Sequence, residues 1–119
     1  MLDTRLYPAQ LARVIDGDTV ELDFDVGFHV TVRHSVRLFG INCPEMHGES
    51  KVAGQLAKAF AEAWFAVQED GIVAHTIKGR TEDKYGRYLA RIYPKKPGAS
   101  LNAALLTAGH AVVYMADDE

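Results

Sequence analysis

Alternating apolar and polar residues predict strands in the first third of the chain. Residues 19–24 alternate strictly, as in a half-buried strand. Residues 25–28 read as a turn, in which Gly27 supplies a permissive backbone. Apolar residues then recur from Val30 to Ile41, which predicts a longer strand. These segments predict a β-meander.

From Val52 onward, apolar residues recur every three or four positions and no longer every second position. A set recurring at this spacing predicts a helix that turns one apolar face toward the core: Val52, Leu56, Phe60, Ala63 and Val67. Ser50 is the expected N-cap, and Asp70 with Gly71 the expected end. Trp64 and Phe65 also lie in this helix, where core packing is expected.

The second half predicts two strands, a helix and a strand. Residues 72–77 and 88–93 read as strands joined by a turn at residues 84–86. Ser100 is expected to cap a short helix that Gly109 ends. Residues 111–114 read as a last strand.

The order β-β-β-α-β-β-α-β predicts a mainly β fold with helices, of the α+β class. With antiparallel strands in about 110 residues, it favours a five-stranded Greek-key barrel of the OB-fold type with two helices. We expect a single domain over residues 1–119, since this length supports one hydrophobic core. An unrelated α+β sandwich fits the same pattern.

Composition narrows the class of protein. The chain is 48% hydrophobic and 24% charged, which is typical of globular proteins and not of disordered ones. No apolar run approaches the roughly 20 residues that cross a bilayer, and no secretory signal begins the sequence. We therefore expect a cytoplasmic protein, or one encoded by a phage or mobile element, that is monomeric and has no membrane partner. The single cysteine, Cys43, excludes an intramolecular disulfide.

Charge is unevenly distributed, although the net charge is only −3. Between residues 78 and 96 lie seven of the 13 basic residues and two of the 16 acidic ones. Acidic residues gather instead between residues 16 and 25. This pattern would serve an anionic substrate beside a cation, but on charge alone two solvated strand faces are the favoured explanation.

Two segments carry candidate metal chemistry. In V-I-D-G-D-T (residues 14–19), two carboxylates flank a glycine, which suits a tight turn but also a simple capped hairpin. In R-L-F-G-I-N-C-P-E (residues 37–45), Pro44 restrains Cys43 and could fix the direction of its carbonyl. The Asp18 carboxylate, the Asn42 amide and the Cys43 carbonyl form an oxygen-rich set suited to Ca²⁺ or Mg²⁺. Glu45 follows closely enough to hold a water.

Two arginines complete the set. Arg37 begins the second segment, and Arg87 ends D-K-Y-G-R (residues 83–87). A guanidinium binds phosphate oxygens in a fixed fork and keeps its charge. Each arginine alone would be an ordinary surface residue, but two arginines, a divalent cation and a carboxylate suit phosphoryl transfer. The five histidines show no metal-ligand spacing.

V-I-D-G-D-T, R-L-F-G-I-N-C-P-E and D-K-Y-G-R-Y-L-A resemble, in order and spacing, three signature segments of the staphylococcal nuclease-like (thermonuclease) family. The resemblance runs from about Leu11 to Tyr114. It implies an OB-type barrel and a Ca²⁺-dependent phosphodiesterase that cuts DNA and RNA and leaves 3′-phosphates. Mg²⁺ or Mn²⁺ could replace Ca²⁺.

The resemblance also implies roles for individual residues. Asp18 would be the metal carboxylate and Asp16 an acid that supports it from the turn. Residue 42 would be a second ligand and the Cys43 carbonyl a third. Three residues would be catalytic. Arg37 would contact the scissile phosphate, Glu45 would activate or orient the attacking water, and Arg87 would stabilise the transition state. Lys84 and Tyr85 would border the terminal phosphate, and Tyr114 is placed to stack on a base.

Two departures from the family pattern matter most. The family usually has Asp at residue 42 and Thr at residue 43, whereas this chain has Asn42 and Cys43. Asn removes a charge, which predicts weaker metal binding but not its loss. The function therefore stays open between an active nuclease, a non-catalytic module that binds nucleic acid or protein, and a structural or small-ligand OB domain. Retention of Arg37, Glu45 and Arg87 favours the enzyme.

Overall fold

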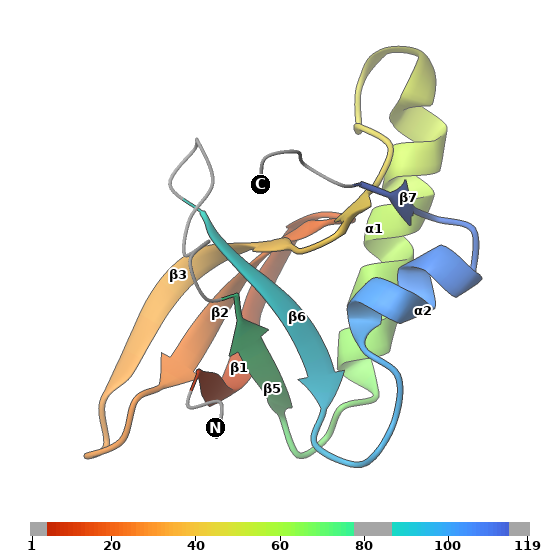
Figure 1. The fold of residues 1–119 in the computed structure, drawn as a ribbon. Coiled ribbons are helices and arrows are strands. Elements are labelled where there is room, and N and C mark those ends of the chain that lie inside the picture. Colours follow the sequence, from red (N-terminus) through yellow and green to blue (C-terminus); the bar gives the residue numbers. More distant parts are fainter. Residues whose placement is uncertain (1–4, 78–86, 115–119) are drawn as a thin grey trace.

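Five strands close into a barrel in the computed structural model, which describes residues 5–77 and 87–114. The strands follow the order β1-β2-β3-β6-β5 around the barrel (Figure 1). Their bounds are β1 (Leu6–Asp16), β2 (Thr19–Asp25), β3 (Thr31–Leu38), β5 (Ile72–Thr76) and β6 (Tyr88–Pro94). The predicted OB-type barrel of the α+β class is confirmed, and the alternative sandwich is excluded.

The long hairpin of β2 and β3 sets the position of the site residues. Its antiparallel register places Thr19 opposite Arg37. Gly27 has the predicted turn conformation, with φ of +87°. Phe28 and His29 also adopt positive φ, so the turn is longer than predicted. The pairing of β3 with β6 is parallel, which corrects the expectation of antiparallel strands throughout.

The strand predicted from Val30 to Ile41 is interrupted. It ends at Leu38, and Gly40 turns the chain with φ of +84°. A two-residue strand, β4 (Ile41–Asn42), then pairs with β7 (Val112–Val113) outside the barrel. The last predicted strand is thus shorter than expected and lies beside the site segment.

Helix α1 (Lys51–Ala66) follows a 3₁₀ turn, η1 (Gly48–Ser50). The predicted apolar face was wrong, since Val52, Leu56 and Val67 are 69%, 55% and 71% exposed. The helix instead buries a face made of three small residues, Gly54, Ala57 and Ala61, together with Phe65. Small side chains let the helix approach β1 and the site closely, and this contact decides which face is buried.

The ends of α1 also differ from the prediction. Ser50 precedes the helix, but its hydroxyl donates hydrogen bonds to the carbonyls of Glu45 and His47 and does not cap a helix amide. The helix ends at Ala66, four residues before the predicted stop at residues 70–71. Phe60 and Trp64 pack partly against the core, while Phe65 is buried in it.

Helix α2 (Leu101–Thr107) lies beside α1 and packs against β6 (Figure 1). The predicted cap is confirmed, since Ser100 Oγ accepts a hydrogen bond of 3.0 Å from the Ala103 amide. Buried Asn102 ties the helix to β6, accepting from the Ile92 amide at 3.1 Å. Over the described ranges, neither helix has the length and apolar character needed to cross a membrane.

Candidate active site

The turn between β1 and β2 presents Asp18 to the rest of the candidate site. Asp16 Oδ1 accepts a hydrogen bond of 3.2 Å from the Asp18 amide, which fixes the turn. Leu38 then donates its amide to the Asp18 carbonyl at 2.9 Å. The turn is therefore held from both β1 and β3.

The two acids of this turn have different ionisation behaviour. Burial raises the pKa of Asp16 to about 6, and the hydrogen bond and charge of Asp18 add to this effect. Burial also opposes ionisation of Asp18, but hydrogen bonds from Asp16, the Cys43 amide and Arg37 hold its pKa below the usual value. Asp18 therefore stays ionised to a lower pH than Asp16 does.

Gly17 packs directly against Cys43 and helix α1. A Cβ at residue 17 would lie 2.8 Å from the Ala57 Cβ and 2.9 Å from the Cys43 Sγ. The Cys43 thiol is thus packed among core residues, and burial beside Asp18 and Asp16 raises its pKa to about 12. The Cys43 amide, in contrast, donates to Asp18 Oδ2 at 2.8 Å.

Arg37 joins the turn to β4. Its Nη1 lies 2.9 Å from Asp18 Oδ2, with 14% and 8% of the two side chains exposed. Its Nη2 donates to the Ile41 carbonyl and to Asn42 Oδ1, both at 3.1 Å. Since a guanidinium has five N–H donors, these three contacts leave two for an anion. Two proposed metal ligands, Asp18 and Asn42, therefore share one arginine.

Thr19 is a site residue that the sequence reasoning missed. Its hydroxyl accepts a hydrogen bond of 3.1 Å from Arg87 Nη1 and donates one of 3.2 Å to Asp18 Oδ1. One carboxylate oxygen of Asp18 thus contacts Arg37, and the other is linked to Arg87 through the Thr19 hydroxyl. The available signal was the position of Thr19 directly after the D-G-D turn.

Tyr114 lies on the outer side of Arg37. The guanidinium carbon is 5.6 Å from the centre of the Tyr114 ring, and the Tyr114 amide donates to the Gly40 carbonyl at 2.9 Å. Tyr114 therefore lies next to Arg37, and its stacking on a base stays a prediction. Lys84 and Tyr85 lie outside the described residues.

Glu45 belongs to the same segment but points elsewhere. Within residues 5–77 and 87–114, its carboxylate contacts His47 Nε2 at 3.0 Å, not Asp18 or either arginine. Both side chains are largely exposed, at 74% and 80%. The Glu45 backbone is closely packed, because a Cβ on Gly54 would collide with the Glu45 carbonyl. Helix α1 thus fixes the backbone of Glu45 and leaves its side chain in solvent.

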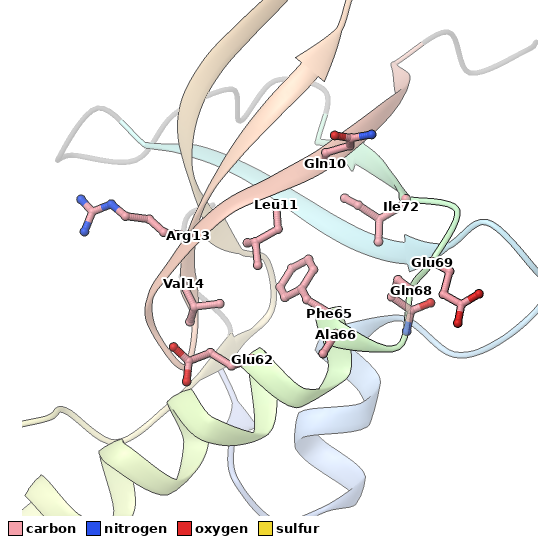
Figure 2. A pocket seen from close by; sticks show the side chains of 11 residues that line it. Gln10, Leu11, Arg13, Val14, Glu62, Phe65, Ala66, Gln68, Glu69 and Ile72 are labelled. Atoms are coloured by element: carbon pink, nitrogen blue, oxygen red, sulfur yellow. The ribbon is translucent and has the colours of Figure 1, made fainter.

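A separate cavity of about 550 Å³ lies between β1 and the end of α1 (Figure 2). Apolar side chains, among them Leu11 and Phe65, form its floor, and polar side chains such as Arg13 and Glu62 surround it. None of the candidate site residues described above lines it. We assign it no role in the site.

Comparison with known proteins identifies the family. A sequence profile described as staphylococcal nuclease homologue matches residues 35–119. The chain belongs to the staphylococcal nuclease homologue family. The matched range contains both arginines and the segment from Asn42 to Glu45, whereas Asp16 and Asp18 precede it. The hairpin register nevertheless brings Asp18 to Arg37.

One relative extends the comparison beyond the profile. An uncharacterized protein of Methanocaldococcus jannaschii is 28% identical over 134 residues. The alignment covers 95% of this chain and 62% of the relative, so the chain spans less than two thirds of the relative's length. Membership of this family supports a nuclease-like domain.

Proposed function

We propose that this protein is a metal-dependent phosphodiesterase that hydrolyses DNA or RNA and leaves 3′-phosphate ends. The arrangement of two arginines around Asp18 carries this proposal: Arg37 contacts it directly, and Arg87 through Thr19. Membership of the nuclease-homologue family supports the same reaction class. In OB folds, oligonucleotides bind at two loops, which follow the first and the fourth strand of the barrel. Here Asp18 lies between β1 and β2, and Arg87 lies between β5 and β6.

The donor atoms suit a hard cation such as Ca²⁺. Asp18 stays ionised, Asn42 offers an amide oxygen and Cys43 a backbone carbonyl, and oxygen ligands of these types bind Ca²⁺. The described residues contain no group of three or more His, Cys, Asp or Glu side chains arranged for a metal. The proposed set has only one carboxylate, which is the physical basis for expecting weak metal binding. When bound, the cation would stabilise negative charge on the phosphate.

Each side chain then has a defined task. The two N–H donors that Arg37 retains bind the scissile phosphate and oppose its growing charge. Arg87, oriented by Thr19, donates to the leaving oxygen. Glu45 orients the attacking water or accepts its proton, and its exposed position gives solvent access to the carboxylate. Asp16 keeps the turn in place for Asp18.

A second function is a nuclease-like module that binds nucleic acid without cutting it. The pairing of Glu45 with His47, away from Asp18, favours this alternative, because the proposed water-handling group is not aimed at the other site residues. The arginine arrangement would still bind phosphate. The two functions differ only in whether a bond is broken.

One assay separates them. The protein is incubated with single-stranded DNA or RNA in Ca²⁺, Mg²⁺, Mn²⁺ or EDTA, and products are identified by mass spectrometry. We expect 3′-phosphate fragments with a divalent cation, none with EDTA, and loss of cleavage in Glu45→Gln and Arg87→Ala. Binding without cleavage under every condition would support the module instead.

A further inference from the structure

A second arginine-containing surface adjoins Arg37 on the outer face of β3 and β6. Arg37 is paired in register with Leu89. Arg91 lies two residues further along β6, so it shares the outer face with Leu89, about 6.6 Å away along the strand. Arg37, Leu89 and Arg91 all line one cavity of about 600 Å³ between these strands and α2.

The charged side chains among the described residues that line this cavity are both basic. None of the described residues that line it is acidic, and two of them are arginines. Arg91 has no ion pair within residues 5–77 and 87–114; its guanidinium carbon lies 4.9 Å from the centre of the Phe39 ring. The interaction is a cation–π contact, which leaves the N–H edge of a guanidinium available to an anion.

Hydrogen bonds hold the backbone of Phe39 and of the part of β6 that carries Arg91. Phe39 donates its amide to the Ala90 carbonyl at 2.9 Å and accepts from Asn102 Nδ2 at 2.8 Å. Asn102 also holds β6 on both sides of Arg91, through the Ile92 amide at 3.1 Å and the Ala90 carbonyl at 3.3 Å. The backbones of Phe39 and of the segment that carries Arg91 are therefore fixed before any ligand binds, which lowers the entropic cost of binding.

We propose that Arg91 binds a second phosphate of the nucleic-acid strand, next to the phosphate held by Arg37. A strand repeats one phosphate per nucleotide, so a cavity with two arginines on one face accommodates two phosphates of a polymer. The ligand class is a polynucleotide, not a mononucleotide. This inference rests on the proposed nucleic-acid substrate, but not on cleavage.

The test is equilibrium binding of a fluorescent single-stranded DNA 12-mer in EDTA at several salt concentrations. Each neutralised phosphate in a single strand contributes about 0.7 to the slope of log affinity against log salt. We expect Arg91→Gln to reduce that slope by about this amount, and Arg91→Lys to keep it. Arg33→Gln is the matched control, because Arg33 lies on the same strand as Arg37 but pairs with Asp23; its slope should equal that of the wild type.

The outcomes distinguish this proposal from the nuclease proposal. If the wild type binds the 12-mer but cleaves it with no metal, the nuclease proposal fails. The effect of Arg91→Gln on the salt slope can still be measured in that case. If Arg91→Gln has the wild-type slope, or if the wild type does not bind the 12-mer, the second phosphate site is overturned. Where cleavage occurs, Arg91→Gln should raise KM severalfold for the 12-mer and leave hydrolysis of a nitrophenyl phosphodiester of one nucleoside unchanged.

Discussion

The carboxylate of Asp18 and the guanidinium of Arg37 form an ion pair of 2.9 Å that is almost wholly shielded from solvent. The pair joins the β1–β2 turn to β3, and the Cys43 amide donates to the same carboxylate oxygen. The site is thus part of the structural framework of the barrel. Changes to these residues should be measured for stability as well as for activity.

Asp18→Ala should lower the free energy of unfolding by about 3 kcal/mol, because removing one partner leaves the Arg37 charge buried and unpaired. Chemical denaturation in EDTA measures this directly. Asp23→Ala is the matched control, since Asp23 forms an exposed pair with Arg33 and should leave stability essentially unchanged. Equal stability of the two variants would show that the Asp18–Arg37 pair does not hold the turn.

Asn42→Asp should strengthen metal binding. It adds a second carboxylate beside Arg37 Nη2, which the Asn42 amide oxygen now contacts at 3.1 Å, and Ca²⁺ affinity rises with the charge of its ligands. We expect severalfold tighter Ca²⁺ binding by calorimetry and a lower Ca²⁺ concentration for half-maximal cleavage. Asp25→Asn, a change at an exposed acid near the opposite end of β2, should alter neither. No change in Ca²⁺ affinity in Asn42→Asp would remove residue 42 from the proposed ligand set.

Thr19→Val should reduce kcat roughly tenfold with little change in KM. The substitution keeps the shape of the side chain but removes the hydroxyl that accepts from Arg87. A hydrogen bond to a charged group contributes about 1.5 kcal/mol, which is roughly tenfold in rate. Steady-state kinetics on a single-stranded oligonucleotide check this. Thr19→Ser should keep most of the activity because it retains the hydroxyl. Equal kcat in Thr19→Val and the wild type would mean that Arg87 needs no support from Thr19.

Cys43 should react slowly with alkylating reagents in the folded protein. Its thiol packs against Gly17 and Ala57, and its raised pKa leaves little thiolate at pH 8. Mass spectrometry should find iodoacetamide labelling at least tenfold slower in the native protein than in urea. Cys43→Ala should keep activity within about threefold, since the proposed ligand is the carbonyl; rapid labelling with loss of activity would place the thiol in the cleft.

Gly54→Ala should destabilise the protein, against the usual effect of this substitution. Alanine in a helix interior is normally favoured over glycine by about 0.5–1 kcal/mol. Here its Cβ would collide with the backbone of Glu45 and Met46, so we expect lower stability and reduced cleavage together. Ala59→Gly, at an exposed position of α1, gives the ordinary propensity effect for comparison. A more stable Gly54→Ala would show that the Glu45 segment moves freely.

The sequence predicted the barrel, because strand alternation and turn chemistry are local signals. The roles of the site residues stay predictions. The sequence did not predict which face of α1 is buried. Val52 and Leu56 looked like core residues, but Gly54 and Ala57 pack against the site because they permit close approach. Helical periodicity alone does not show which of two apolar faces fits a neighbour.

The sequence also did not predict which side chains the site residues contact. The pairing of Thr19 with Arg37 depends on the register of the β2–β3 hairpin, which the length and conformation of residues 26–30 set. Thr19 itself looked like an ordinary strand residue. The position of the Glu45 side chain depends on its contact with His47, and no sequence pattern predicts that contact.

The most direct measurement is the initial rate of cleavage of a labelled single-stranded DNA in Ca²⁺ by the wild type and by Arg87→Ala, with an EDTA control for each. We expect Ca²⁺-dependent cleavage by the wild type, a rate at least a hundredfold lower in Arg87→Ala, and no cleavage in EDTA. An equal rate in the two proteins, or no wild-type cleavage of DNA or of RNA with any divalent cation, would contradict the nuclease proposal.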